Sequence, residues 1–225
     1  MAPFVRTLVE ASVGLVIIAL AWAIASVVVD NAAKLPPLMA VLRKTVELAG
    51  SDDYLRHVSE SSTALFLGLL PALVVGVLLG ACAGLSPSLR WLLGPLAITL
   101  GGAPLIALVP IFLAWFGLTM LTKALTVFVV AAFPVMIMVM VATGAKGGAS
   151  PVCTILAGLR LGLVLGVSAL VVVEFVASSR GVGYFITNSA NMFDTTAMVA
   201  GIVLVAVPTT LVAALLQAIE EQVAG

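Results

Sequence analysis

The sequence contains about six apolar segments, each about as long as a bilayer requires, and this feature constrains the fold most strongly. A helix is expected in each, because a backbone in lipid must satisfy its own hydrogen bonds. With 63% hydrophobic and only 9% charged residues, a water-soluble globule would lack the polar surface that it needs. The segments span residues 11–29, 63–83, 91–116, 124–141, 152–177 and 197–216. These segments predict an all-α membrane protein with one transmembrane domain over residues 1–225.

The first segment resembles a signal peptide, because Arg6 precedes an apolar run that ends in small residues. A run over residues 11–29 is too long for the core of a typical signal peptide. We therefore expect a retained anchor, and a multi-pass protein of the bacterial inner membrane.

The third segment, residues 91–116, contains several residues that interrupt helices. These are Pro95, Gly101, Gly102, Pro104 and Pro110. A broken membrane helix is tolerated where protein or a cavity satisfies its freed backbone groups. The segment is therefore predicted to be bent, and to face the interior of a bundle or a substrate path.

An amphipathic helix is predicted over residues 36–48, between the first two apolar segments. Prolines begin it, and apolar residues then alternate with Arg43, Lys44 and Glu47 at helical spacing. Such a helix is expected to lie along the membrane surface, either as a simple strap or as a gate or docking ledge.

Glycines recur at four-residue spacing in the second and fifth segments. They are Gly76, Gly80 and Gly84 in the second, and Gly158, Gly162 and Gly166 in the fifth. This spacing gives a smooth helix face that lets another backbone approach closely. The predicted use is packing within the chain, and the alternative is an interface with another subunit.

Two charged residues fall within the fifth segment. Arg160 lies near its start, where a long side chain can reach the lipid headgroups, and Glu174 lies about one turn inside its end. A carboxylate within a membrane is a functional candidate, and the structural alternative is that Glu174 pairs with Arg180 or caps a neighbouring helix.

The remaining residue patterns exclude several classes of function. The net charge is zero and no basic stripe occurs, so no nucleic-acid partner is expected. Cys82 and Cys153 lie in or beside apolar segments, and His57 lies in a charged connection, so we predict no disulfide, no metal and no cofactor. Phosphate-binding loops and motifs for nucleophilic or metal-dependent hydrolysis are absent, so the chain is predicted not to be an enzyme.

Four pieces of the sequence, in order, resemble permease subunits of ATP-binding-cassette importers in the nitrate, sulfonate and taurine group. Along the chain they are Leu35-Pro36-Pro37 with the helix after it, the stretch from Gly102 to Gly117, Phe133-Pro134, and Ile155 to Gly162 followed by Val173-Glu174 and Gly181 to Tyr184. The resemblance covers nearly the whole chain. It implies the type I importer-permease fold, a cytoplasmic N-terminus, a homodimer around the path, a cytoplasmic ATPase and a periplasmic binding protein. The distribution of Lys and Arg does not itself favour that orientation.

One feature of the family has no counterpart in this sequence. Members carry, between the fourth and fifth spans, a cytoplasmic loop with a Glu-Ala-Ala motif whose short helices fit a groove on the ATPase. Here only residues 143–151 join the two spans, and they form helices poorly. The residues concerned are Gly144, Lys146, Gly147, Gly148 and Pro151. The sequence therefore predicts a coupling loop truncated by roughly two dozen residues.

Two functional hypotheses follow, and a third is kept. In the first, the chain has lost ATPase coupling and serves as a structural or assembly subunit of a larger membrane complex, respiratory or photosynthetic, with other membrane subunits and lipid as partners. In the second, it is a working importer permease for a small anion such as nitrate, sulfonate or taurine, and its ATPase docks elsewhere, for example at residues 86–90. The third is an unassisted channel or carrier.

Overall fold

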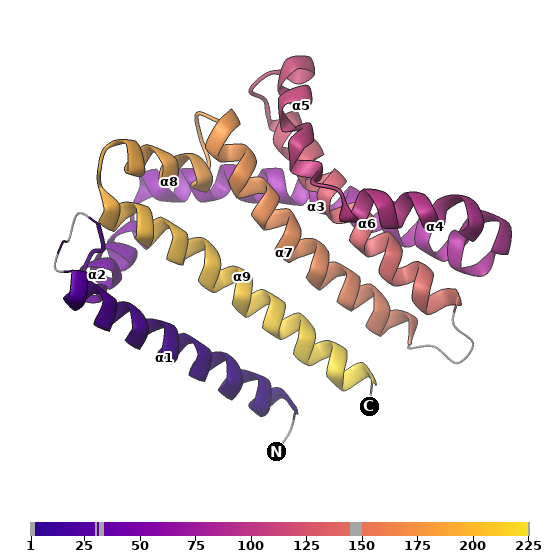
Figure 1. Cartoon of the computed structure of the whole chain (residues 1–225), viewed down its shortest axis with the longest axis horizontal. Helices are drawn as coiled ribbons and strands as arrows, with labels where there is room; N and C mark the ends of the chain where they lie inside the picture. The colour runs from indigo at the N-terminus through magenta and orange to yellow at the C-terminus, as the bar shows by residue number, and fades with distance from the viewer. Residues whose placement is uncertain (1–2, 30, 32–33, 145–149, 225) are drawn as a thin grey trace.

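The computed structural model describes residues 3–29, 31, 34–144 and 150–224, and all regular structure in these ranges is helical (Figure 1). The all-α prediction is therefore confirmed. The elements are α1 (Pro3–Val29), α2 (Leu38–Ala49), α3 (Asp52–Leu85), α4 (Pro87–Gly102), a 3-10 helix η1 (Leu105–Leu108), α5 (Val109–Phe116), α6 (Met120–Gly144), α7 (Pro151–Ala177), α8 (Val182–Asn191) and α9 (Thr195–Ala224).

Four of these helices, α3, α6, α7 and α9, are long and apolar enough to cross a membrane. The pair formed by α4 and η1–α5 passes the same test together but is bent by 86°. The bend begins after Gly102, and Pro110 lies in the first turn of α5, where a missing amide proton costs nothing. With the 27-residue helix α1, these spans are consistent with about six, and the predicted break of the third segment is confirmed.

Helix α6 lies at the centre of the bundle, between α3 and α7. Val127 and Val135 of α6 are fully buried and form its contact points with both neighbours. On the α3 side, a Cβ atom built on Gly76 would lie 2.8 Å from the Val135 Cβ atom. On the α7 side, a Cβ built on Gly162 would lie 3.2 Å from a Val135 methyl group. Dispersion forces across these close backbones hold the three helices together.

The other predicted glycines take similar positions within the chain. Cβ atoms on Gly80 and Gly84 would overlap α6, whereas on Gly158 and Gly166 they would make ordinary or tight contacts with it. Both glycine faces are therefore turned toward α6 of the same chain, and neither is free to form an interface with another subunit.

Helix α2 packs against α9 and the start of α3. Val41 and Leu48, on its apolar face, are buried in one cluster with Tyr54, Val182, Ile186 and Ala200. Beside this face, α2 carries the Lys44–Glu47 ion pair at 2.7 Å. The indole Nε1 of Trp22 donates to the carbonyl of Pro36, which ties α1 to the start of this helix. The predicted amphipathic segment thus contacts α1, α3 and α9 at one end of the bundle.

Two helices differ from the prediction. Helix α3 begins at Asp52 instead of residue 63. Asp52 and Asp53 favour a helix N-terminus, and the charged residues that follow them continue the helix into the apolar segment. Helix α8 was not predicted, because it is only ten residues long, far shorter than a membrane span, and contains Gly183, Asn188 and Asn191.

The bent α4–α5 segment packs on the bundle with only part of its surface: Val109 lies in the core with residues of α3, α6 and α7, whereas much of α4 and α5 is exposed, and its predicted place beside a substrate path stays a prediction. Trp91 and Trp115 are 82% and 71% exposed, and Ile98 is 63% exposed. Figure 1 shows α5 projecting away from the other helices. The freed backbone of the break is instead accommodated by η1 and by turns at Ala103 and Pro104.

We predict that Gly76→Ala destabilises the protein by about 1–3 kcal/mol, because the added methyl group overlaps Val135 and the Ala132 carbonyl in a close-packed contact. Gly102→Ala is the matched control, since no atom lies within 4 Å of its Cβ position. Unfolding of both purified variants by denaturant in detergent measures the difference. Equal stability of the two variants would contradict the packing described here.

Candidate functional site

A cluster of polar groups, buried except for the partly exposed Glu60, lies where α3, α6, α7 and the start of α8 meet. We define this polar cluster as Glu60 and Ser61 of α3, Lys123 of α6, Glu174 of α7 and the backbone of residues 180–183. The Glu174 side chain is fully inaccessible, and that of Lys123 is only 4% exposed. Charges this deep persist only when partners replace their lost hydration.

Lys123 supplies the positive charge of the polar cluster. Its Nζ atom lies 3.4 Å from Glu174 Oε1 and 3.3 Å from Glu60 Oε1. It also donates a 2.8 Å hydrogen bond to the Arg180 carbonyl. One ammonium group of α6 therefore joins α3, α7 and the turn before α8, through two hydrogen bonds and an ion pair.

Glu174 receives the remaining donors. The Ser61 hydroxyl donates to its carboxylate at 2.8 Å, and the Gly183 amide donates to Oε2 at 2.9 Å. The Ser61 oxygen in turn accepts the Val182 amide at 2.8 Å. Because the Val182 and Gly183 amides belong to the first turn of α8, the carboxylate and the hydroxyl together cap that helix.

The turn between α7 and α8 can form only with glycine at two positions. Gly181 has φ of +119°, a conformation that side chains rarely adopt, and a Cβ atom there would overlap the Glu174 carboxylate. A Cβ on Gly183 would lie 2.6 Å from the Val171 carbonyl. These glycines let the backbone approach the carboxylate closely enough to donate to it.

Two sequence-based interpretations are corrected by this geometry. Glu174 pairs with Lys123, whereas the Arg180 side chain is exposed and only its carbonyl takes part. The alternative that Glu174 caps a neighbouring helix is correct, because its carboxylate accepts the Gly183 amide at the start of α8. His57 lies in α3 and not in a loop, and its Nδ1 accepts a 3.1 Å hydrogen bond from the Gly181 amide.

Lys123, Ser61 and Glu60 were missed as site residues from the sequence. Lys123 stands immediately before the apolar segment 124–141, and Glu60 and Ser61 precede segment 63–83, so all three read as residues flanking a span. One signal was available. If successive spans cross the membrane in opposite directions, the starts of segments 63–83 and 124–141 and the end of segment 152–177 lie on the same side, which brings Glu60, Lys123 and Glu174 to one level.

Arg160 does not simply extend to the headgroups. Its NH1 atom donates to Gln217 Oε1 at 3.2 Å, and its NH2 atom lies 3.4 Å from Glu220 Oε2. The Cys153 thiol contacts the Glu220 carbonyl on the same helix. These contacts attach the C-terminal part of α9 to the start of α7, at the opposite end of the bundle from the polar cluster.

The connection between α6 and α7 is short. Helix α6 ends at Gly144 and α7 begins at Pro151, so six residues join them. The predicted loop residues Lys146, Gly147 and Gly148 lie outside the described residues. Gly144 packs directly against the Arg90 guanidinium, which donates a 2.7 Å hydrogen bond to the Gly84 carbonyl. The α3–α4 turn and the end of α6 therefore share one surface.

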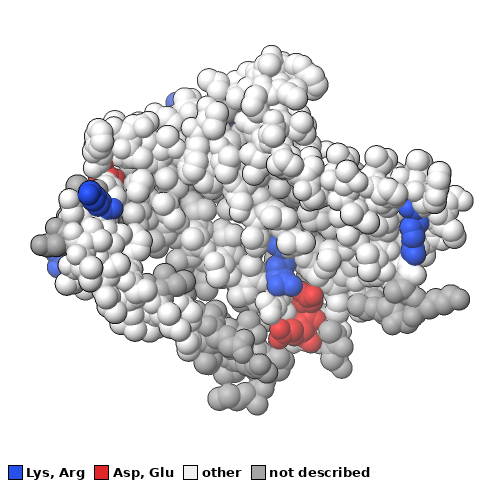
Figure 2. Space-filling model, in the orientation of Figure 1, with Lys and Arg blue, Asp and Glu red and all other residues white. Residues whose placement is uncertain are grey.

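The polar cluster is suited to holding helices together rather than to bond-breaking chemistry. Its carboxylates and lysine are paired with one another, and no group of three or more His, Cys, Asp or Glu residues is placed to hold a metal ion in the part of the chain that the structure describes. Cys82 and Cys153 are both free thiols. The face in Figure 2 is almost entirely uncharged, with a few scattered basic side chains and one acidic patch that adjoins a basic one at the lower centre.

We predict that Lys123→Met lowers the free energy of unfolding by about 3–5 kcal/mol, because it leaves the Glu174 carboxylate buried without its cation. Lys44→Met removes a lysine from the exposed pair with Glu47 and is expected to cost about 0–1 kcal/mol. Denaturant unfolding in detergent compares the two. A Lys123 variant as stable as the Lys44 variant would show that the buried pair does not hold the bundle together.

Comparison with known proteins agrees with this architecture. Residues 152–225, which contain α7, α8 and α9, match the family described as binding-protein-dependent transport system inner membrane component. The chain is 30% identical over 218 residues to the putative aliphatic sulfonates transport permease protein SsuC of Bacillus subtilis, covering 85% of this chain and 78% of that protein. It is 28% identical over 217 residues to the taurine transport system permease protein TauC of Escherichia coli, covering 83% and 78%.

A further relative is the formylaminopyrimidine transport permease protein ThiX of Halalkalibacterium halodurans, which is 25% identical over 197 residues, covering 77% of this chain and 78% of that protein. These relatives are permeases and not enzymes, and their similarity extends over most of the chain. The chain therefore belongs to the family of binding-protein-dependent transport system inner membrane components, as a multi-pass inner-membrane permease subunit of the taurine and sulfonate group of ATP-binding-cassette importers.

Proposed function

We propose that this chain forms the membrane path of an importer for small organic anions of the sulfonate class, and that it is not itself an enzyme. The observation that carries the proposal is similarity over most of the chain to two permeases, one named for taurine and one for aliphatic sulfonates. The partners proposed are a second copy of the chain, a cytoplasmic ATPase and a periplasmic binding protein.

An importer moves only when the ATPase contacts a part of the permease that differs between two states. The six-residue connection between α6 and α7 is too short to contain a helix of several turns in addition to its turn. We therefore place the ATPase contact at the surface shared by the α3–α4 turn and the end of α6. A hollow of about 390 Å³ opens there, lined by Gly84, Leu85, Pro87, Arg90, Trp91 and Gly144.

A second candidate function is a permease fold that has lost coupling and serves as a structural subunit of a larger membrane complex. The short connection favours it. The alignment with the taurine permease spans 217 positions but includes 83% of this chain's 225 residues, about 187, so about 30 positions have no residue here. A total of about 30 positions is large enough to include the roughly two dozen residues expected for the coupling loop. The exposed apolar surface of α4 and α5 offers a face to foreign helices.

Isolation of the native complex in mild detergent, followed by mass spectrometry of every chain, tests the first proposal. We expect an ATPase with a nucleotide-binding loop at a fixed ratio to this chain, and ATP-driven uptake of radiolabelled taurine or an alkanesulfonate after reconstitution in liposomes. A complex that contains unrelated membrane subunits and no ATPase would overturn the importer proposal and support the structural one.

Disulfide cross-linking tests the proposed ATPase contact. In a background in which Cys82 and Cys153 are replaced by alanine, Ser88→Cys in the first turn of α4 is expected to cross-link to a cysteine on the ATPase. Ser59→Cys is the matched control, because it is also an exposed serine but lies near the opposite end of α3. Cross-linking of neither cysteine, or of Ser59→Cys alone, would contradict a contact at this turn.

A further inference from the structure

The turn between α7 and α8, residues 180–183, is held by side chains from outside itself. Its four consecutive backbone groups, from the Arg180 carbonyl to the Gly183 amide, each bond to a side chain of α3, α6 or α7. In the order of the groups that they bind, these side chains are Lys123, His57, Ser61 and Glu174. Three of them belong to the polar cluster, and His57 is the fourth point of attachment.

His57 differs from the other three side chains in its chemistry. Histidine changes charge between about pH 5 and 8 in its ordinary state. In the structure its Nδ1 atom accepts a 3.1 Å hydrogen bond from the Gly181 amide. A ring nitrogen that accepts a hydrogen bond carries no proton, so the closed turn corresponds to a neutral ring with its proton on Nε2.

Protonation of Nδ1 would place two hydrogen-bond donors against each other. Turning the ring over would not restore an acceptor, because both nitrogens of a protonated imidazole are donors. The Gly181 backbone also packs directly against the Glu174 carboxylate, which leaves it little room to retreat on that side. The protonated ring is therefore incompatible with the closed turn.

The His57 ring is held in place by the helix that follows the turn. Its centroid lies 5.9 Å from the ring centroids of both Tyr184 and Phe185 of α8. His57 also precedes Ser61 by four residues of α3, so both side chains lie on one face of that helix and both meet the turn. A change at the ring therefore acts on the first turn of α8.

The charged groups around the ring act in both directions. Asp53 and Glu60 of α3 favour its protonated form, whereas Lys123 of α6 and Arg180 of the turn oppose it. Glu174 of α7 is paired with Lys123, and α8 carries no charged residue. Because the two signs balance in number, the hydrogen bond from the turn and the partial burial of the ring decide the outcome, and both favour the neutral form.

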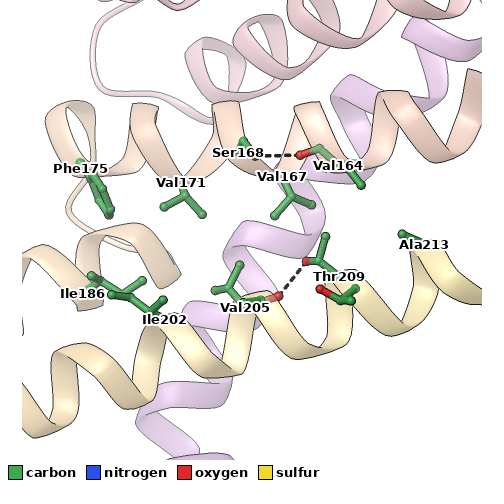
Figure 3. A pocket seen from close by; sticks show the side chains of 12 residues that line it. Val164, Val167, Ser168, Val171, Phe175, Ile186, Ile202, Val205, Thr209 and Ala213 are labelled. Carbon is green, nitrogen blue, oxygen red and sulfur yellow. Dashed lines mark hydrogen bonds between the residues drawn. The ribbon is translucent and has the colours of Figure 1, made fainter. Parts of the chain in front are cut away.

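Beyond its first turn, α8 packs through apolar side chains. Figure 3 shows Ile186 of α8 beside Ile202 of α9, at one end of a hollow between α7 and α9. Ile186 and Val182 also lie in the buried cluster with Val41 and Tyr54. Apolar contacts are not directional, so the hydrogen bonds of the turn decide how the first residues of α8 are placed.

We propose that the hydrogen bond between His57 and Gly181 is a pH-sensitive latch on the α7–α8 turn. The latch is closed while His57 is neutral, and protonation of His57 opens it and frees the first turn of α8. The closed state binds one proton fewer than the open state, so acid favours opening. This regulation goes beyond the proposed transport function, and rests on it only for the side of the membrane. Helix α3 runs from the latch to the α3–α4 turn, so the latch lies opposite the proposed ATPase contact.

Selective ¹⁵N labelling of histidine gives a direct test, because His57 is the only histidine in the chain. At about pH 8, the nuclear magnetic resonance spectrum of the tag-free protein in detergent is expected to show a neutral ring with its proton on Nε2. Hydrogen exchange of residues 180–185 is measured by mass spectrometry and corrected for the intrinsic effect of pH. We expect protection to be about two- to tenfold lower at about pH 5 than at about pH 8, as His57 becomes protonated.

Two substitutions separate the latch from other effects of acid. His57→Asn keeps an acceptor near the position of Nδ1 that cannot be protonated, so protection is expected to stay high at both pH values. His57→Phe keeps a ring against Tyr184 and Phe185 but removes the acceptor, so protection is expected to be low at both. Residues 127–135 of α6 are the internal control, and their protection is expected to stay unchanged.

Four results would overturn the proposal. They are a proton on Nδ1 at about pH 8, unchanged protection of the wild-type turn at about pH 5, an equal loss in the wild type and His57→Asn, and a His57→Phe turn as protected as that of the wild type. An equal loss in residues 127–135 would overturn it as well, because a latch acts locally. None of these measurements depends on transport or on an ATPase, so they can fail independently of the proposed function.

Discussion

The arrangement of the helices depends on one buried ammonium group. Lys123 lies among the carboxylates of Glu60 and Glu174 and the carbonyl of Arg180, with almost no access to water. Because neither Lys123 nor Glu174 can be buried alone without a large desolvation cost, α3, α6 and α7 must meet at one point and in one register. The same carboxylate receives the first amides of α8, which sets where the chain turns back toward α9. Apolar packing alone, in a bilayer whose lipid tails are equally apolar, would specify this register less strictly.

The sequence predicted the apolar elements well, because length and hydropathy decide them. The four long spans, the break after Gly102 and the amphipathic helix before α3 follow from bilayer thickness, proline geometry and helical period. The glycine spacing also identified the faces that meet α6. The polar cluster could not be predicted in the same way, since Lys123 and Ser61 become partners of Glu174 only when α3, α6 and α7 are placed side by side. Local spacing drew attention to Arg180, six residues from Glu174, whereas the true partner is 51 residues away in the sequence.

The short connection between α6 and α7 determines how force could reach the membrane domain. In a coupled importer, a cytoplasmic segment must be held by the ATPase strongly enough to shift a packed bundle between two states. Six residues between Gly144 and Pro151 leave little to hold, but Arg90 joins this end of α6 to the α3–α4 turn. A load applied to that turn would act on α3 and α6 together. The importer and the structural subunit therefore differ in what contacts one small surface, and share the same fold.

The valines of α6 that fit opposite glycines have a mechanical consequence. Val127 and Val135 each stand between a glycine of α3 and at least one glycine of α7, so their side chains occupy notches on both neighbours. Sliding α6 along either helix would drive these side chains against backbone that cannot yield, and shear between the three helices is blocked. Any change of shape in the membrane must then move α3, α6 and α7 as one rigid body. Helices outside this unit, among them the α4–α5 segment with its 86° bend, are not held by these notches.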